Sequence, residues 1–378
     1  MDKTIRLLIA GDFCPNGRVA TMLCSSERGT IFRDIKPLVT SCDAGIVNLE
    51  CPVVQRVAQP IVKEGPHLKT DSEAVELLKE SGFSMVTLAN NHIKDFGSEG
   101  IVDTIEALDK VGIAHVGAGK DLKEAERVYY FECKGKRVAI INCCEHEFSI
   151  ASEQAAGANP LNPIQQWHAI QEAKQKADFV VVIVHGGHEH YSLPSPRMQE
   201  TYRFFVDAGS DAVINHHQHC LSGFETYKGK PIFYGLGNFC FDWEGQRDSD
   251  WNYGFLVELE LGATIDFTIH PYEQCNQTPD VRLLVGSKKE QVNEQIRQLN
   301  AVFQSPKELT EAHTRWMKQD EREWLISLLP FGRIIKALIR RRILPLCLPK
   351  RTIVWLLNKV ECESHRDKLR FILKQQIR

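Results

Sequence analysis

The first 240 residues alternate short apolar runs with amphipathic segments, and this alternation limits the fold more than any other feature of the chain. The apolar runs predict strands over Ile5–Ala10, Ala44–Leu49, Ser84–Leu88, Val138–Asn142, Phe179–Val184, Ala212–Ile214 and Ile232–Tyr234. The segments between them predict helices over Ser72–Ser81, Glu99–Val111, Pro163–Lys176 and Pro196–Ala208. Such alternation is typical of a layered α/β sandwich, in which helices flank central mixed sheets.

The rest of the chain predicts a sheet edge followed by helices. Residues Phe255–Pro271 predict two further strands with polar alternation. Past about residue 277 the pattern becomes helical, and Ser305-Pro306-Lys307-Glu308 is a capping box that predicts a helix as far as about Leu329. The expected domains are an α/β body over 1–280, a helical extension over 281–330 and a basic amphipathic helical tail over 331–378.

Acids, asparagines and histidines follow the predicted strands at the points where the strands end. These residues are Asp12, Glu50, Asn90-Asn91-His92, His185 and His216-His217-Gln218-His219. In an open α/β sheet the carboxyl ends of the strands converge on one crevice, so we expect these side chains to lie close together. Carboxylate and imidazole donors suit Zn, Mn or Fe, or a pair of such ions that share a carboxylate. One such residue after a strand is most often part of a turn, whereas five groups in succession predict a metal site.

Several stretches match a known family of proteins. They are GDFCPNGR at 11–18, NLECPV at 48–53, LANNHIKDFG at 88–97, GAGKD at 117–121, HGGHEHY at 185–191 and NHHQHCLSGFETYKGKPIFYGLGNFCFD at 215–242. Over residues 4–245 the chain resembles the capsule-synthesis CapA family, also called PGA_cap, whose members serve poly-γ-glutamate synthesis. The fold of that family is similar to the calcineurin-type metallophosphoesterases, and we expect the same fold here.

The resemblance implies a site with two divalent metal ions, either Mn, Zn or Fe. Its ligands would be Asp12, Glu50, Asn91, His185, His217 and His219. Asp12 would bind one ion, Glu50 would bridge both, and Asn91 with His185 would bind the second. His217 and His219 would divide between the two ions.

The resemblance also implies roles for residues around the metals. His92 would protonate the leaving group. For Arg18 it is the charge and the position in the sequence that predict a role, which is to steady a phosphate-like anion. Glu225 and Asn238 would orient a histidine from behind, and Glu189 would lie at the rim of the pocket. The chain departs from the metallophosphoesterase pattern at Cys14, which stands where that pattern has a histidine. Two interpretations stay open for Cys14: a thiolate ligand, or a small buried hydrophobe.

Charge is distributed unevenly along the chain. Residues 331–378 hold thirteen Lys and Arg against three Asp and Glu, a balance of +10, whereas residues 1–330 hold 33 against 46, a balance of −13. The acidic body argues against nucleic acid as a partner. In the tail, apolar residues at helical spacing alternate with arginine and lysine. This helix either docks on an anionic membrane surface or a membrane synthase, or packs its apolar stripe on the body.

The location expected from the sequence is the cytoplasm, peripheral to the inner face of the membrane. The first residues lack the pattern of a secretory signal, and no apolar run approaches the roughly 20 residues of a membrane span. The twelve cysteines contain no Cys-x-x-Cys pair, which predicts reduced thiols.

Two functions stay open. The first is a metal-dependent hydrolase that acts on a phosphorylated or amide-linked intermediate in the synthesis of a capsule polymer of the poly-γ-glutamate type. The second is a non-catalytic subunit that binds the anionic polymer or organises a membrane synthase complex. In both cases the expected partner is the envelope polymer or its precursor.

Overall fold

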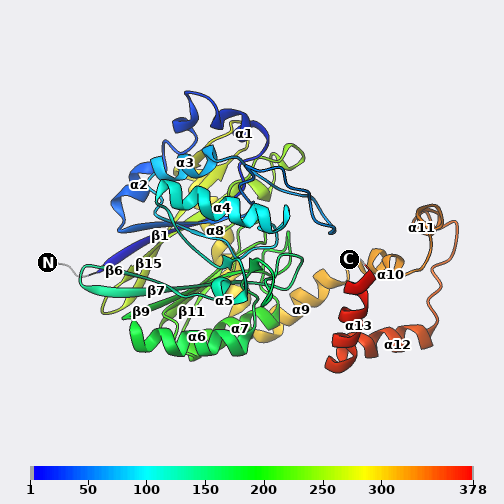
Figure 1. Ribbon diagram of the computed structural model, residues 1–378. Coiled ribbons are helices and arrows are strands. Elements are labelled where there is room, and N and C mark those ends of the chain that lie inside the picture. The colour runs from blue at the N-terminus through cyan, green and yellow to red at the C-terminus, as the bar shows by residue number, and fades with distance from the viewer. Residues whose placement is uncertain (1–3, 377–378) are drawn as a thin grey trace. The chain divides into compact units, whose positions relative to one another are not determined.

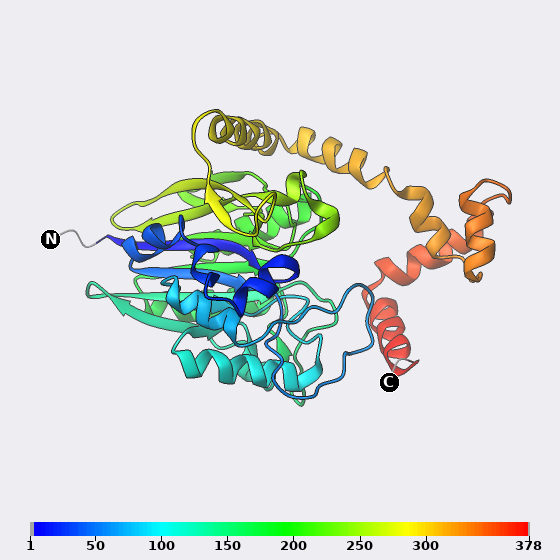
Figure 2. The same cartoon turned by 90° about the horizontal axis from the view of Figure 1, so that it is seen from above.

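A computed structural model describes residues 4–376 and divides the chain into two compact units. The first unit, which we call the body, ends at Leu309 and contains every described strand. The second, which we call the C-terminal unit, begins at Thr310 and is helical. Figures 1 and 2 show the chain from two directions.

Two large sheets form the centre of the body. The larger sheet contains β1 (Ile5–Phe13), β2 (Ala44–Leu49), β3 (Met85–Thr87), β4 (Ala114–Val116), β13 (Asn238–Cys240), β14 (Tyr253–Leu261), β15 (Ile265–Gln274) and β16 (Val281–Leu283). The smaller sheet contains β6 (Tyr129–Cys133), β7 (Lys136–Cys144), β9 (Phe179–His185), β10 (Ala212–His216), β11 (Phe224–Tyr227) and β12 (Lys230–Phe233). Two short strands, β5 (Ala118–Gly119) and β8 (Gly157–Ala158), pair with each other.

Both sheets are mixed. The order of the larger sheet is β16-β15-β14-β1-β2-β3-β4, with β13 paired to the end of β1. The order of the smaller sheet is β11-β12-β10-β9-β7-β6. The inner strands run parallel, as β1 does with β2 and β9 does with β10, whereas β14, β15, β6 and β11 pair antiparallel towards the edges. The predicted mixed sheets are confirmed.

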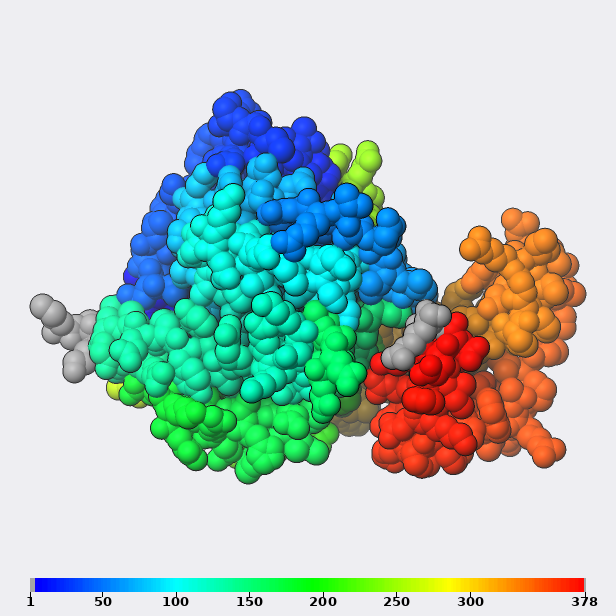
Figure 3. All heavy atoms as spheres, in the orientation of Figure 1, coloured from blue at the N-terminus to red at the C-terminus, as the bar shows by residue number. Residues whose placement is uncertain are grey.

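Helices cover the outer faces of both sheets. The helices of the body are α1 (Gly17–Leu23), α2 (Lys36–Ser41), α3 (Glu73–Glu80), α4 (Gly97–Val111), α5 (Leu122–Ala125), α6 (Pro163–Lys176), α7 (Pro196–Asp207) and α8 (Gly286–Phe303). In Figure 1, α2, α3 and α4 lie on one side of the strands, and α6 and α7 lie on the other. On the face drawn in Figure 3, segments coloured blue to green make up the surface of the body.

The core is divided in the same way as the layers. Alternate residues of the two sheets, such as Ile9 and Ile183, form one buried cluster between the sheets. The opposite face of the larger sheet packs against α3 and α4, and that of the smaller sheet against α6 and α7. The inner strands are therefore buried on both faces, as their continuous apolar sequences predict.

The predicted elements agree with the structure except for several short or edge strands. Strand Ala44–Leu49 and helix Pro163–Lys176 have the predicted bounds, and Phe255–Pro271 forms the predicted strand pair. Strands β4, β6, β11, β13 and β16 were not predicted. They are short, or lie at sheet edges where few residues are buried, so their apolar patterns are weak.

The structure divides the chain at a different position from the boundaries expected at residues 280 and 330. Helix α8 falls in the expected extension, but it belongs to the body. Its apolar side chains Val292, Ile296 and Phe303 are buried, and the helix packs on β11 and β15. Val292 and Ile296 belong to the cluster between the two sheets, so this apolar stripe holds the helix against β11 of one sheet and β15 of the other.

The C-terminal unit consists of short helices. They are the larger part of α9 (Pro306–Met317), then α10 (Glu321–Ser327), α11 (Arg333–Arg340), α12 (Lys350–Glu361) and α13 (Glu363–Gln376). The single helix predicted as far as Leu329 is therefore wrong, because the chain turns at residues 318–320. There the Gln319 N–H bonds the Trp316 carbonyl, which closes a tight last turn. No helix among residues 4–376 has the length and apolar content to cross a bilayer.

Candidate functional site

Strand ends bring the predicted ligands together in the body. Asp12 lies near the end of β1, Glu50 directly follows β2, and His185 ends β9. His217 and His219 follow β10, which pairs with β9 so that His216 lies opposite His185. All five predicted ligands on these strand ends are buried.

Nitrogen atoms of neighbouring residues surround the carboxylates of Asp12 and Glu50. Asp12 Oδ1 accepts a hydrogen bond from Asn48 Nδ2 at 2.7 Å, and its Oδ2 accepts one from the His217 backbone N–H at 3.1 Å. Glu50 Oε1 lies 3.4 Å from His185 Nε2 and 3.6 Å from His219 Nε2. Both carboxylates therefore face imidazole rings rather than solvent.

A second set of donors converges on the ring of His185. Its Nε2 lies 3.0 Å from Asn91 Oδ1 and 3.0 Å from His217 Nδ1. Together with Glu50, these residues place one carboxylate oxygen, one amide oxygen and two ring nitrogens around a common point.

Among residues 4–376, three groups of side chains have ligand atoms close enough to hold a metal ion. They are Asp12, Glu50 and His219; Glu50, His185 and His217; and Glu189, His217 and His219, with the atoms of each group within 4.8 Å of one another. Glu50 belongs to the first two groups, so its carboxylate lies between two candidate positions. The first two groups contain only residues that the sequence predicted as ligands.

The carboxylate of Glu50 gives a structural test of whether these residues fit a metal ion. The side chain is fully buried, yet neither of its oxygens has a hydrogen-bond partner among the described residues. A buried carboxylate without partners is costly, and such groups normally neutralise, pair or coordinate a metal. The oxygen and nitrogen donors present therefore fit divalent ions such as Zn, Mn or Fe.

The backbone at the two paired histidines is strained. His217 has a φ of 96° and His219 a φ of 55°, in the left-handed region that residues with a Cβ seldom adopt. Strain of this kind persists where the surrounding structure fixes it, and it gathers at functional sites. The strained turn directs both rings towards Glu50.

Asn238 orients one of these rings. Gly11 lets β13 lie close to β1, because a Cβ on Gly11 would be 1.9 Å from the Gly237 carbonyl oxygen. This pairing places Asn238 beside Asp12, and Asn238 Oδ1 lies 2.9 Å from His219 Nδ1. With its proton on Nδ1, His219 presents the Nε2 lone pair towards Glu50.

We expect Asn238→Ala to lower the affinity for Zn or Mn by about 10–100-fold, because the ring of His219 loses the partner that fixes its tautomer. Isothermal titration of the metal-free protein measures this affinity. The matched control is Asn276→Ala, which removes another buried amide whose Nδ2 bonds Glu273. Equal affinities in both variants would show that Asn238 does not orient a ligand.

Burial shifts the protonation of the whole cluster. It raises the pKa of Asp12 to about 8, with the charge of Glu50 adding to the effect, and the pKa of Glu50 to about 7. Burial and neighbouring imidazoles lower the pKa of His185 and His217, and of His216 to about 3. These histidines are therefore neutral, which is the form that binds metals.

The raised carboxyl pKa values predict how the metal-free protein responds to pH. The unfolded chain releases these protons near pH 4, whereas the folded chain holds them until about pH 7 and 8. Their contribution to stability is therefore complete below about pH 4 and is lost as the pH rises through about 8. We expect the melting temperature of the chelated protein to fall by several degrees between about pH 5 and pH 9, at about 2–4 °C per kcal/mol. Calorimetry with and without Mn should show larger stabilisation by the ion at the higher pH, and a melting curve independent of pH would contradict this prediction.

His92 lies beside the donor groups and is held by Asp95. His92 Nδ1 contacts Asp95 Oδ2 at 2.8 Å, and Lys63 Nζ lies 3.0 Å from the same ring nitrogen. Lys63 and Asp95 form a buried ion pair, and Asp95 Oδ2 also accepts a hydrogen bond from the Leu68 backbone. Asp95 thus ties the loop after β2 to His92 and leaves the Nε2 of His92 as the nitrogen able to act on a substrate.

A cavity of about 240 Å³ opens beside this cluster. Its wall includes His92, His219 and Glu189, and its other side is aromatic. The lining residues are Pro66, Leu68, His92, Glu189, His190, His219, Phe241, Trp243, Gln246 and Trp251. The Trp251 ring centre lies 4.9 Å from that of His219, so the aromatic wall reaches the donor group. Glu189 is exposed at this opening, at the predicted rim.

Two residues expected to serve the site have other partners. Arg18 forms two-nitrogen contacts with Asp242, at 2.8 and 3.0 Å, and its other N–H groups bond the carbonyls of residues 275–277. With its donors engaged in this way, Arg18 joins segments distant in sequence and does not present its guanidinium to an anion. Glu225 pairs with Arg203 at 2.6 Å and accepts a hydrogen bond from the Tyr234 hydroxyl, so it does not orient a histidine.

Cys14 is a buried hydrophobic residue. Its side chain packs in the cluster between the larger sheet and its helices. Burial raises the pKa of its thiol, with Cys51 adding to the effect, so the residue is a neutral thiol. It belongs to none of the three donor groups.

Sequence reasoning missed several residues of the site. Asn48, which donates a hydrogen bond to Asp12, is the first residue of the NLECPV stretch at 48–53. Its position two residues before Glu50 is a sequence signal that could have identified it. Lys63 comes from a loop with no regular pattern. Glu147, whose Oε1 lies 3.7 Å from His217 Nε2, is likewise on an irregular segment. Trp251 lies in a short 3-10 helix, Asp250–Asn252.

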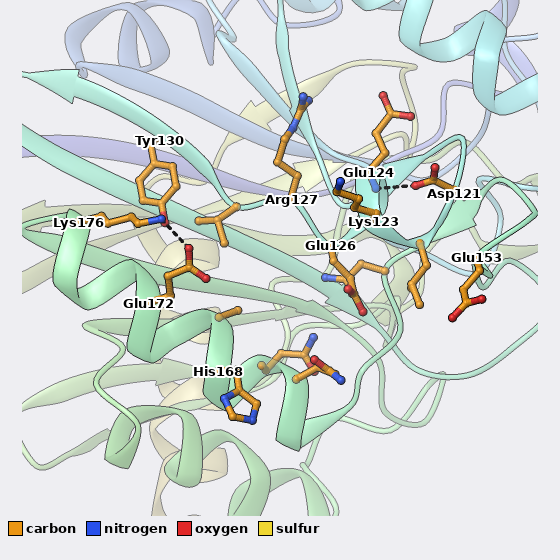
Figure 4. Close-up of a pocket in the computed structure, with 16 residues that line it drawn as sticks. Asp121, Lys123, Glu124, Glu126, Arg127, Tyr130, Glu153, His168, Glu172 and Lys176 are labelled. Atoms are coloured by element: carbon orange, nitrogen blue, oxygen red, sulfur yellow. Dashed lines mark hydrogen bonds and ion pairs between the residues drawn. The ribbon is translucent and has the colours of Figure 1, made fainter.

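A larger cavity of the body lies elsewhere. It has a volume of about 1020 Å³ and lies along α5 and α6 (Figure 4). Its charged side chains include an ion pair between Lys176 and Glu172, and Asp121 caps α5. None of its lining residues belongs to the three donor groups, and none of its carboxylate oxygens is both buried and without a hydrogen-bond partner, as those of Glu50 are. The donor cluster is therefore the candidate site.

Comparison with known proteins gives matches over most of the body. A family model described as bacterial capsule synthesis protein PGA_cap matches residues 6–243, a span that contains all the donors described above. The capsule biosynthesis protein CapA of Bacillus anthracis is 33% identical over 258 residues, which are 66% of this chain and 63% of that protein. The PGA biosynthesis protein CapA of Bacillus subtilis strain 168 is 32% identical over 285 residues, 74% of each chain.

The match spans less than two thirds of the length of the B. anthracis protein. Among solved structures, one described as a novel phosphatase from Mycoplasma pneumoniae aligns with 73% of this chain and 96% of its own. The identity is 15% and the TM-score is 0.46.

Proposed function

The chain belongs to the bacterial capsule synthesis protein family PGA_cap, and from this premise we propose that its body is a metal-dependent hydrolase of capsule polymer synthesis. The substrate would be a phosphorylated or amide-linked intermediate of a polymer of the poly-γ-glutamate type. The observation that carries the proposal is the buried carboxylate of Glu50, which lacks hydrogen-bond partners and is shared by two donor groups. The name of the B. subtilis relative, a PGA biosynthesis protein, supports this choice of polymer.

The proposed cofactor is a pair of divalent ions. Asp12, Glu50 and His219 would hold one, and Glu50, His185, His217 and Asn91 would hold the other. When bound, such a pair supplies Lewis acidity that polarises a phosphoryl or carbonyl oxygen and lowers the pKa of water.

The side chains around the metals would carry the other tasks. His92 would hold a proton at Nε2, while Asp95 fixes the orientation of its ring through Nδ1. In hydrolysis of a phosphoester, a water oxygen would form the new bond to phosphorus and release one proton to solvent. The bond to the leaving oxygen would break, and that oxygen would take the proton of His92. The aromatic side chains of Phe241 and Trp251 would limit the entry of further water to the cavity.

We propose that the protein works at the inner face of the membrane, where a polymer synthase would supply its substrate. The support is the positive charge of residues 331–378, a balance of +10, next to an acidic body.

Hydrolysis assays with chromogenic substrates test the reaction. Protein loaded with Mn or Zn is mixed with bis-p-nitrophenyl phosphate, p-nitrophenyl phosphate or γ-glutamyl-p-nitroanilide. We expect nitrophenol release from a phosphoester, or nitroaniline from the amide, and loss of the activity in His217→Ala. The control is His168→Ala, on α6 and outside the donor groups. Failure of all three substrates in metal-loaded protein would contradict a hydrolase of either type.

A non-catalytic role is the second candidate, and one observation favours it. Cys14 replaces an imidazole that the metallophosphoesterase pattern places at the first strand, and its thiol is buried in the apolar core. A site with one ligand fewer could bind an anionic polymer without cleaving it. Binding of γ-glutamate oligomers in calorimetry, with no hydrolysis of any substrate, would favour this polymer-binding or scaffold subunit.

A further inference from the structure

The helices of the C-terminal unit leave large apolar side chains in solvent. The exposed fraction is 79% for Ile334 on α11, 57% for Trp355 on α12 and 65% for Phe371 on α13. Further exposed residues of the same kind are Trp324, Leu328, Phe331, Ile335, Ile343, Val354, Leu357 and Val360. Single exposed apolar residues are ordinary, but a series along consecutive helices marks an interaction surface.

These apolar residues form faces on the helices. On α11, Ile334 and Leu338 are four residues apart and share one side. Ile335 is one turn before Ile339, which packs against Ile326 and Leu329, so Ile335 lies at the edge of that packed side. On α12, Ile353, Leu357 and Val360 follow one another at helical spacing. The small cluster around Ile326 therefore gives the unit a core and leaves these faces unused.

Basic residues border the apolar faces. Arg333 lies on α11, Lys350 and Arg351 begin α12, and Arg370 and Lys374 flank the apolar run Phe371–Leu373 of α13. Trp355 adds an indole ring with Lys359 Nζ 5.6 Å from its centre. Apolar side chains with neighbouring cations and tryptophan are the combination that lies in the interface of an anionic bilayer.

We propose that the C-terminal unit docks on the surface of a membrane rich in anionic lipid, with the apolar faces of α11 and α12 in the headgroup region. Charge and the exposed apolar side chains favour a membrane over two other partners, a second copy of this chain and a soluble polyanion. Two copies meeting through these faces would bring together two segments of +10 charge each, which repel. A polyanion in water, such as the polymer itself, would pair with the cations but leave the apolar side chains hydrated.

The proposal concerns residues outside the donor cluster and outside the matched span 6–243, so its failure would leave the proposed reaction untouched. The proposal rests on the proposed location at the inner face of the membrane. It names the residues that would contact the lipid and states that their apolar faces would lie in the headgroup region.

Vesicle co-sedimentation with the full chain tests the proposal. Vesicles of phosphatidylglycerol and phosphatidylcholine are compared with phosphatidylcholine alone at 0.15 M salt. We expect partitioning at least about tenfold stronger to the anionic vesicles, and a blue shift of tryptophan fluorescence that Trp355→Phe reduces.

Two variants separate the apolar and the ionic contributions. Ile334→Glu with Trp355→Glu, and Arg351→Glu with Arg370→Glu, should each weaken partitioning by about tenfold or more. The matched control is Ile164→Glu with Val285→Glu, which changes two body residues that are 68% and 79% exposed and should leave partitioning unchanged.

Several results would overturn the proposal. One is absence of binding to anionic vesicles, and another is equal binding of the apolar variant and the wild type. A wild-type dimer in sedimentation that Ile334→Glu converts to monomer would assign the face to a second copy. A lower melting temperature of the variant Ile334→Glu with Trp355→Glu, without a change in partitioning, would show that the apolar faces stabilise the folded chain and do not bind lipid. Binding of soluble polyglutamate without binding of vesicles would assign the cations to the polymer.

Discussion

Replacing Glu50 with glutamine is expected to abolish tight metal binding. The variant keeps the size of the side chain but removes the one carboxylate that two donor groups share. Each position would then lose its bridging negative charge, and the amide N–H groups of glutamine would face neighbouring ligand atoms. We expect wild type loaded with Mn or Zn to retain about two ions per chain after desalting, and Glu50→Gln to retain well below one. Elemental analysis by mass spectrometry measures both values.

Glu225→Gln is the matched control for that result. Glu225 lies in another of the stretches that carry the family resemblance, but its carboxylate pairs with Arg203 and Tyr234. We expect this variant to keep its metal and to melt at a lower temperature. Metal-free Glu50→Gln should melt no lower than the metal-free wild type at about pH 8, because it removes a buried charge. Retention of two ions by Glu50→Gln would refute the bridging role.

Replacing His92 with glutamine should produce the largest loss of turnover that leaves the metals bound. His92 lines the cavity but belongs to none of the donor groups, so metal content should equal that of the wild type. Loss of a general acid costs about 10²–10⁴ in rate. The measurement is the kcat for whichever chromogenic substrate the wild type hydrolyses. The loss should be greatest with the poorest leaving group, because that group depends most on the proton.

Asp95→Asn distinguishes a positioning role from a catalytic one. Asp95 touches His92 Nδ1 and Lys63 rather than the cavity, so its loss should lower kcat less than that of His92 and leave KM and metal content unchanged. His168→Ala is the control for a histidine outside the site. A kcat of His92→Gln close to that of the wild type would show that His92 is not the general acid. Loss of metal from both His92→Gln and Asp95→Asn would show that His92 is a metal ligand.

The sequence predicts the donor cluster well because the cluster depends on short-range patterns. Each predicted ligand follows a strand whose apolar run is visible in the sequence, as Asp12 follows Ile5–Ala10 and His185 follows Phe179–Val184. Parallel pairing brings together the ends of β1 and β2 in one sheet and of β9 and β10 in the other, and the packing of the two sheets brings these two pairs of ends to one site. The resemblance assigns the same residues, and the distances around Glu50 place them within reach of common ions.

The residues around the cluster depend on contacts across long stretches of chain. Arg18 is 224 positions from Asp242, its ion-pair partner, so its sequence neighbours suggest a free cation. Lys63 reaches His92 from an irregular loop, and the aromatic wall of Trp251 comes from a segment beyond the matched span. No periodicity connects such pairs.

The sequence by itself determined the layered fold, the donors at the strand ends and the basic amphipathic character of the C-terminal helices. These features follow from apolar spacing and from the ends of strands, which are local properties. Only the tertiary structure decided that Glu50 is buried without partners, that Asp95 holds His92 and that Arg18 and Glu225 serve other contacts. Burial and pairing are properties of the packed chain, because they depend on which distant segments exclude water from a side chain.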